Sequence, residues 1–171
     1  MNVAQQYADF FVRQGCTHAF GLVGGANLGI FRAFADRMKV ISVCHEQAAA
    51  IAASYYYRVS RRIAPCLVTN GAGSANAITG VIDSHMDSVP LMVISGNEQT
   101  RFIKAPRCRT IGFQGISPVD IVHSFTKRCI TVDNALGARL ALEGIYGDML
   151  AGRPGACWID VPQDVANAVA E

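Results

Sequence analysis

The sequence predicts an α/β fold: a single three-layer α/β/α domain, residues 1–171, built on a six-stranded parallel sheet. Short apolar runs alternate along the chain with segments of helical periodicity. Few polar residues interrupt these runs, as expected for parallel strands that are covered on both faces. The chain has 171 residues, which suits one domain, and contains no internal repeat or linker.

In the first half of the chain, apolar residues recur at helical spacing in three segments, and two continuous apolar runs separate them. Gly15 is positioned to end the first helix, and Asn27 is positioned to cap the second. The expected elements are, in order, helix 3–14, strand 18–23, helix 27–36, strand 40–43 and helix 47–58.

The second half continues the alternation, with one exception. Residues 96–115 are irregular and polar, and a connection of this length usually carries function. The expected elements are, in order, strand 64–69, helix 74–86, strand 90–95, a short helix 118–123, strand 128–132, helix 134–150 and strand 156–161.

Composition excludes several classes of protein. Hydrophobic residues make up 51% of the chain and charged residues 16%, which is apolar for a free-standing domain and predicts a face buried in an oligomer. The net charge of +2 and the short arginine clusters do not indicate a surface that binds the phosphates of a nucleic acid. No segment resembles a signal peptide or a membrane span.

Cysteine usage indicates a reducing, cytoplasmic location. No two cysteines form a Cys-x-x-Cys pair, so no metal site is expected. Cys44, Cys66, Cys129 and Cys157 lie in or beside apolar runs, and we expect them to be small buried residues with free thiols.

Polar and small residues follow several predicted strands, and parallel strands bring such residues to one edge of the sheet. Glu46 follows strand 40–43 and begins a helix, where the helix dipole favours a carboxylate. An acidic residue in a first helical turn also occurs for helix stability alone. The segment 71–76 matches a dinucleotide-binding fingerprint poorly, because its sixth residue is Asn76 and it follows the third strand.

Taken together, the motifs resemble the N-terminal pyrimidine-binding domain of thiamine-diphosphate-dependent enzymes, and most closely the acetolactate synthase and 2-oxo acid decarboxylase group. The resemblance covers nearly the whole chain and rests on five motifs in the family's order. These are residues 20–26, 45–50, 68–77, 87–96 and 152–165.

The resemblance implies roles for particular residues. Glu46 matches the glutamate that hydrogen-bonds N1′ of the cofactor's aminopyrimidine ring and activates the cofactor toward a 2-oxo acid. The aminopyrimidine would be lined by Leu22, Ala72 and Asn76. The positions that match residues near the family's substrate are Gly25, Phe113, Gln114 and Lys127.

The same resemblance implies a partner. The family binds the diphosphate and Mg²⁺ on a separate domain with a Gly-Asp-Gly segment, which this sequence lacks. We therefore expect half an active site, inactive alone and completed in a homo- or hetero-oligomer.

Several alternatives stay open. The chain is a piece of a longer synthase-like enzyme, the small subunit of a split sulfopyruvate- or phosphonopyruvate-type decarboxylase, or a non-catalytic assembly or regulatory module. Acetolactate synthases commonly have an aromatic residue and a proline at Leu22 and Val23, and a proline at Ala72. These departures leave open which 2-oxo acid and acceptor are used, and whether the reaction is decarboxylation or carboligation.

Overall fold

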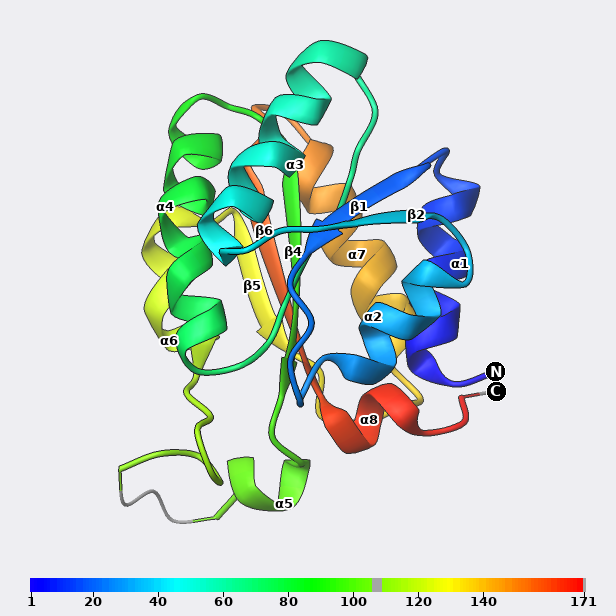
Figure 1. Cartoon of the computed structure of the whole chain (residues 1–171), viewed down its shortest axis with the longest axis vertical. Helices are drawn as coiled ribbons and strands as arrows, with labels where there is room; N and C mark the ends of the chain where they lie inside the picture. The colour runs from blue at the N-terminus through cyan, green and yellow to red at the C-terminus, as the bar shows by residue number, and fades with distance from the viewer. Residues whose placement is uncertain (106–108, 171) are drawn as a thin grey trace.

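The computed structural model describes residues 1–105 and 109–170, and its centre is one sheet of six parallel strands (Figure 1). The strand order is β2-β1-β3-β4-β6-β5. The predicted fold class is therefore confirmed. The strands are β1 His18–Gly21, β2 Lys39–Ser42, β3 Cys66–Val68, β4 Leu91–Asn97, β5 Arg128–Thr131 and β6 Ala156–Pro162.

Helices cover both faces of the sheet (Figure 1). One apolar core lies under α1, α2, α7 and α8, and a second lies under α3, α4 and α6. The helices are α1 Val3–Arg13, α2 Leu28–Ala35, α3 Glu46–Ser60, α4 Ala72–Met86, α5 Thr100–Ile103, α6 Pro118–Val122, α7 Ala138–Leu150 and α8 Gln163–Asn167, and a 3₁₀ turn, η1, spans His123–Phe125.

The two cores are packed differently. The core under α1 and α7 contains Phe10, Phe11, Phe34 and Tyr146, whose rings contact one another edge-on or tilted. The core under α3 and α4 is built from small residues, because these two helices approach closely. At Gly80 of α4, an added methyl group would lie only 2.6 Å from Ala50 Cβ of α3.

Most predicted elements lie within a few residues of their observed bounds, and the differences have local causes. Helix α7 begins at Ala138 rather than at residue 134, because Asn134 Oδ1 accepts a hydrogen bond of 3.0 Å from Gly137 N and holds a turn there. The short helices α5 and α8 were not predicted, since four or five residues are too few to show a helical period.

One prediction about the cysteines is wrong. Cys44 is exposed, although the sequence places it beside an apolar run. Strand β2 is the edge strand of the sheet and ends at Ser42, so Cys44 lies in the loop beyond it. The expected burial holds for Cys66 and Cys157, Cys129 is partly buried, and Cys108 lies outside the described residues.

Candidate functional site

The strand order creates a crevice between β1 and β3. The chain leaves β1 toward β2 and then returns to build β3 on the other side of β1. Ligands of open parallel sheets bind beyond the carboxyl ends of the strands where the order reverses in this way. The segments that follow β1 and β3, residues 22–27 and 69–73, therefore form the walls of the candidate site.

Glu46 lies at this edge of the sheet, and its carboxylate is buried. It is the first residue of α3, and only 6% of it is exposed. Its Oε2 accepts a hydrogen bond of 3.0 Å from Asn76 Nδ2 on α4. A glutamate that served only the helix dipole would remain in water, since burying a carboxylate is costly. The burial and the fixed oxygen therefore favour a binding group.

Glycines pack closely around the other oxygen of Glu46 and around Thr69, where no larger side chain would fit. A methyl group at Gly73 would lie 3.0 Å from Glu46 Oε1 and 2.7 Å from Thr69 Cγ2. A methyl group at Gly24 would lie 2.6 Å from the same Thr69 carbon. The Thr69 hydroxyl is buried and has no hydrogen-bond partner within the described ranges. Buried polar atoms of this kind need a partner, and a polar ligand would supply one.

A buried amide holds the turn that follows β1. Asn27 Oδ1 accepts a hydrogen bond of 2.7 Å from Gly24 N, and Asn27 Nδ2 donates one of 3.0 Å to Leu22 O. The prediction that the Asn27 side chain caps the following helix is wrong, because both of its polar atoms bond backward to this turn. Asn27 thus fixes the backbone on one wall of the crevice.

A hollow of about 250 Å³ opens at the same edge, and we call it the Glu98 hollow. Asn70 Nδ2 donates to Glu98 Oε1 over 3.3 Å, and Gln114 Nε2 donates to Asn70 Oδ1 over 3.4 Å. Gln163 Nε2 donates to Gly25 O over 3.3 Å. The residues that line the hollow are Gly25, Ala26, Asn70, Glu98, Phe113, Gln114 and Gln163.

A second buried carboxylate anchors the loop above this hollow. Asp160 of β6 accepts hydrogen bonds of 2.5 Å from Ser95 Oγ, 2.7 Å from Asn97 Nδ2 and 3.3 Å from Thr131 Oγ1. Burial raises the pKa of Asp160 to about 6, and these hydrogen bonds offset only part of that rise. Asn97 Nδ2 also donates to Ile116 O over 3.1 Å, so the network holds the end of the 97–116 segment.

The residues predicted to line the aminopyrimidine lie at this edge. Asn76 contacts Glu46 directly. Leu22 is half-buried, and its backbone N donates to Leu67 O over 3.2 Å, which ties it to β3. Ala72 is the first residue of α4 and is exposed.

The predicted substrate residues divide into two places. Gly25, Phe113 and Gln114 line the Glu98 hollow, and Phe113 is 90% exposed there. Lys127 does not lie with them. It precedes β5, at the amino edge of the sheet, and its Nζ donates to Ala151 O beyond the end of α7.

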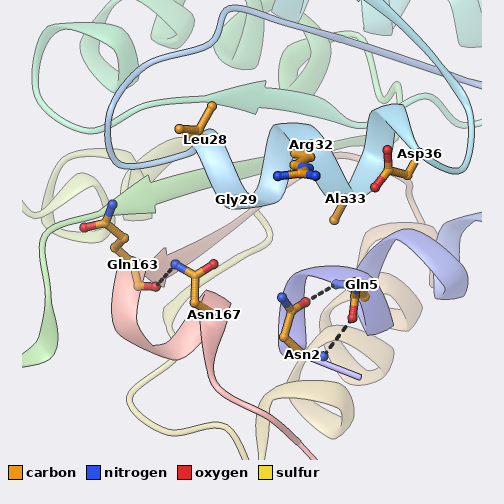
Figure 2. A pocket seen from close by; sticks show the side chains of 9 residues that line it. All are labelled: Asn2, Gln5, Leu28, Gly29, Arg32, Ala33, Asp36, Gln163 and Asn167. Carbon is orange, nitrogen blue, oxygen red and sulfur yellow. Dashed lines mark hydrogen bonds between the residues drawn. The ribbon is translucent and has the colours of Figure 1, made fainter.

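A larger hollow of about 440 Å³ lies between α1, α2 and α8 (Figure 2). Its amides already serve the local structure, because Asn2 and Gln5 cap α1 reciprocally and Asn167 Nδ2 donates to Gln163 O over 2.8 Å. Its lining contains no residue of the crevice walls, 22–27 and 69–73, whereas the Glu98 hollow is lined by Gly25, Ala26 and Asn70 of those walls. The smaller hollow is therefore the better candidate for the substrate.

The sequence assigned no role in the site to Thr69, Asn70, Asp160 or Gln163, and it placed Glu98 only at the carboxyl edge of the sheet. Thr69, Asn70 and Glu98 each follow a strand at that edge, and Gln163 directly follows β6. This position in the sheet was the available signal, and side-chain orientation was not visible from it.

Within residues 1–105 and 109–170, no three His, Cys, Asp or Glu side chains are grouped so as to hold a metal ion. Among the helices of those same residues, none combines the length and the apolar character needed to cross a membrane.

Comparison with known proteins identifies a family and several relatives for this chain. Residues 1–124 match the family described as "Thiamine pyrophosphate enzyme, N-terminal TPP binding domain". An acetolactate synthase of Arthrospira platensis is 34% identical over 165 residues, covering 94% of this chain and 28% of that protein. The acetolactate synthase large subunit of Pyropia yezoensis is 36% identical over 162 residues, covering 92% of this chain and 27% of that protein.

A third relative extends the match over almost the whole sequence. The acetolactate synthase isozyme 2 large subunit of Escherichia coli (strain K12) is 31% identical over 169 residues, which cover 98% of this chain and 30% of that protein. The chain thus spans less than a third of the length of these relatives. The match over residues 1–124 and these identities show that the chain belongs to the thiamine pyrophosphate enzyme family, in which it corresponds to the N-terminal TPP-binding domain.

Proposed function

We propose that this chain is the aminopyrimidine-binding half of a thiamine-diphosphate-dependent enzyme that acts on a 2-oxo acid. The observation that carries the proposal is the buried Glu46 carboxylate, with Oε2 fixed by Asn76 and Oε1 beside Gly73, where no larger side chain would fit. A carboxyl group held dry and immobile is suited to exchanging a proton with a ring nitrogen.

The residues present fit an aminopyrimidine ring. A flat ring needs small residues beside it, and any side chain at Gly24 or Gly73 would press on Thr69. The unpartnered Thr69 hydroxyl and Glu46 Oε1 would supply polar contacts to ring substituents. Leu22, just after β1, and Ala72, at the start of α4, would supply apolar contact.

When bound, thiamine diphosphate supplies the electron sink that decarboxylation of a 2-oxo acid requires. The chain's own contribution is narrower. Glu46 would exchange a proton with N1′ of the bound ring, and Asn76 holds the Glu46 carboxylate in one orientation. Asn27 fixes the turn that would lie beside the ring, through Gly24. These groups act by position, because the carboxylate must meet one ring nitrogen.

The diphosphate, with Mg²⁺, would be held by a separate domain of the same protein or of a partner subunit. The relatives are more than three times as long as the aligned region, which leaves room for such a domain. The complete site would then form in a homo- or hetero-oligomer, and this chain would be inactive alone. Gly25, Phe113 and Gln114 would face the substrate. Lys127 lies at the amino edge of the sheet, so it would contact a substrate only at a site formed with another subunit.

Replacing Glu46 tests the proposal directly. In the assembled enzyme with thiamine diphosphate and Mg²⁺, Glu46→Gln should slow release of carbon dioxide from the 2-oxo acid by about 10²- to 10⁴-fold. The matched control is Glu143→Gln on the exposed face of α7, which should leave the rate unchanged.

The outcome also separates the proposal from its alternatives. If Glu46→Gln retains the wild-type rate, the carboxylate has no role in catalysis, and the chain is an assembly module. If the chain forms the site only with a separately encoded partner, it is the small subunit of a split decarboxylase.

A further inference from the structure

We propose that Glu98 makes the enzyme a carboligase that prefers a neutral, hydroxylated carbonyl compound as its acceptor, bound in the Glu98 hollow. This inference rests on the proposed function and extends it to the second substrate.

The charge of the hollow points away from a second 2-oxo acid. Of the described residues that line it, Glu98 alone is charged, and no Lys, Arg or His is among them. Within the described part of the chain, Glu98 forms no ion pair. The carboxylate of a second 2-oxo acid placed here would face a like charge, and no described lining residue carries a positive charge to offset it. The donor 2-oxo acid loses its own carboxylate as carbon dioxide before it joins the acceptor.

The position of Glu98 is fixed by backbone on either side. A methyl group at Gly112 would lie 2.9 Å from Glu98 Oε2, and one at Gly115 would lie 2.7 Å from Glu98 Cγ. Gly112 has a φ of +60°, which a glycine adopts without strain. The loop therefore bends closely around the Glu98 side chain and limits its freedom to swing away from an incoming anion.

The polar groups of the hollow retain capacity for a ligand. Their mutual hydrogen bonds are long, 3.3 to 3.4 Å between Asn70, Glu98 and Gln114. By comparison, the hydrogen bonds that the buried Asp160 accepts from Ser95 and Asn97 are shorter, 2.5 and 2.7 Å. Long bonds of this kind are weak and are readily exchanged for bonds to a ligand.

Hydroxyl groups match these side chains best. A hydroxyl donates to the Glu98 carboxylate and accepts from the amide NH₂ groups of Asn70, Gln114 or Gln163. An ammonium group carries donors only and cannot accept from those amide groups. A hydrocarbon would bury the carboxylate with only the two long hydrogen bonds that Glu98 Oε1 accepts from described residues, Asn70 and Gln114, which is costly.

The reaction balances without any further reactant. The 2-oxo acid loses carbon dioxide, and its acyl carbon forms a carbon–carbon bond with the carbonyl carbon of the acceptor. The acceptor's carbonyl oxygen takes up one proton and becomes a hydroxyl group. One 2-oxo acid anion, one aldehyde and one proton thus give one hydroxyketone and one carbon dioxide.

The test is a competition between acceptors in the assembled enzyme. With pyruvate as donor, glyceraldehyde and a second pyruvate molecule compete, and NMR separates their hydroxyketone and acetolactate products. Wild type should favour the glyceraldehyde product by about tenfold or more, and Glu98→Gln should shift the product ratio about tenfold toward acetolactate. The exposed Glu143→Gln should leave the ratio unchanged.

A second variant protects the test against a folding defect. Gln163→Lys adds a positive charge to the hollow from α8, a different element, and should shift the ratio in the same direction. Acetolactate as the main wild-type product, or a ratio unmoved by both variants, would overturn the proposal.

The two levels of proposal fail separately. If carbon dioxide is released from pyruvate or from any other 2-oxo acid tried as donor but no carbon–carbon bond forms, the acceptor proposal is wrong and the proposed function stands. If no 2-oxo acid yields carbon dioxide, both fall.

Discussion

The close contact between α3 and α4 gives a prediction whose size follows from the structure. In Gly80→Ala, the new methyl carbon would lie 2.6 Å from Ala50 Cβ and 2.9 Å from Ile51 N. Carbon atoms pack at about 3.5–4.0 Å, so the two helices must separate by about 1 Å. Overpacking of this kind costs about 1–3 kcal/mol, and the better helix propensity of alanine returns up to about 1 kcal/mol. Subtracting about 1 kcal/mol of propensity leaves a net loss of up to about 2 kcal/mol, against a net gain where the methyl group fits freely.

The assay is urea unfolding followed by circular dichroism, with a matched glycine as control. Gly147 is exposed on α7, and no atom lies within 4 Å of an added methyl group. Gly147→Ala should therefore gain up to about 1 kcal/mol of stability from helix propensity alone. If Gly80→Ala is as stable as Gly147→Ala, the close packing described here is wrong. The contact also bears on the site, because the Glu46–Asn76 hydrogen bond crosses between the same two helices.

Three further predictions concern buried or exposed groups. The pKa of Asp160 is about 6 in the folded protein, above its ordinary 3.8, so the folded state binds a proton more tightly than the unfolded state. Lowering the pH from 7 to 4 should therefore raise the unfolding free energy of wild type relative to Asp160→Asn, by up to about 3 kcal/mol. A pH-independent difference between the two unfolding free energies would contradict this. Asn27→Ala should lower the free energy of unfolding by about 1–3 kcal/mol in the same assay, because Gly24 N and Leu22 O lose their hydrogen-bond partner. An unchanged free energy of unfolding would show that these two hydrogen bonds do not stabilise the turn. Cys44→Ser should remove one fast-reacting thiol in a disulfide-exchange assay, because Cys44 is exposed while Cys66 is buried. A fast phase of unchanged amplitude would mean that the Cys44 thiol is buried.

The layered fold could be predicted because strand and helix patterns alternate so plainly along the chain. Runs such as residues 90–95 carry no polar interruption except at the end, and the structure buries all of β4. The strand order could not be predicted in this way. It depends on which strands pair across distant segments, and periodicity carries no such information.

The candidate site was predictable in part. Glu46 and Asn76 could be named because their motifs resemble those of a family, and the structure brings the two side chains to 3.0 Å. The place of Glu98 at the carboxyl edge was predictable because it follows strand 90–95, but its role in the site was not. Its place in the hollow depends on Gly112 and Gly115, which lie in an irregular loop that has no period to interpret. Lys127 was grouped with the site by motif, and the sheet holds it at the opposite edge.

The central claim is that the Glu46 carboxylate activates the cofactor through N1′ of its aminopyrimidine ring. The most direct measurement is the rate at which the C2 hydrogen of bound thiamine diphosphate exchanges with deuterium, followed by quenching and NMR in the assembled enzyme. Glu46→Gln should slow this exchange by about 100-fold or more, whereas Glu143→Gln should not change it. Exchange at the wild-type rate in Glu46→Gln would contradict the claim.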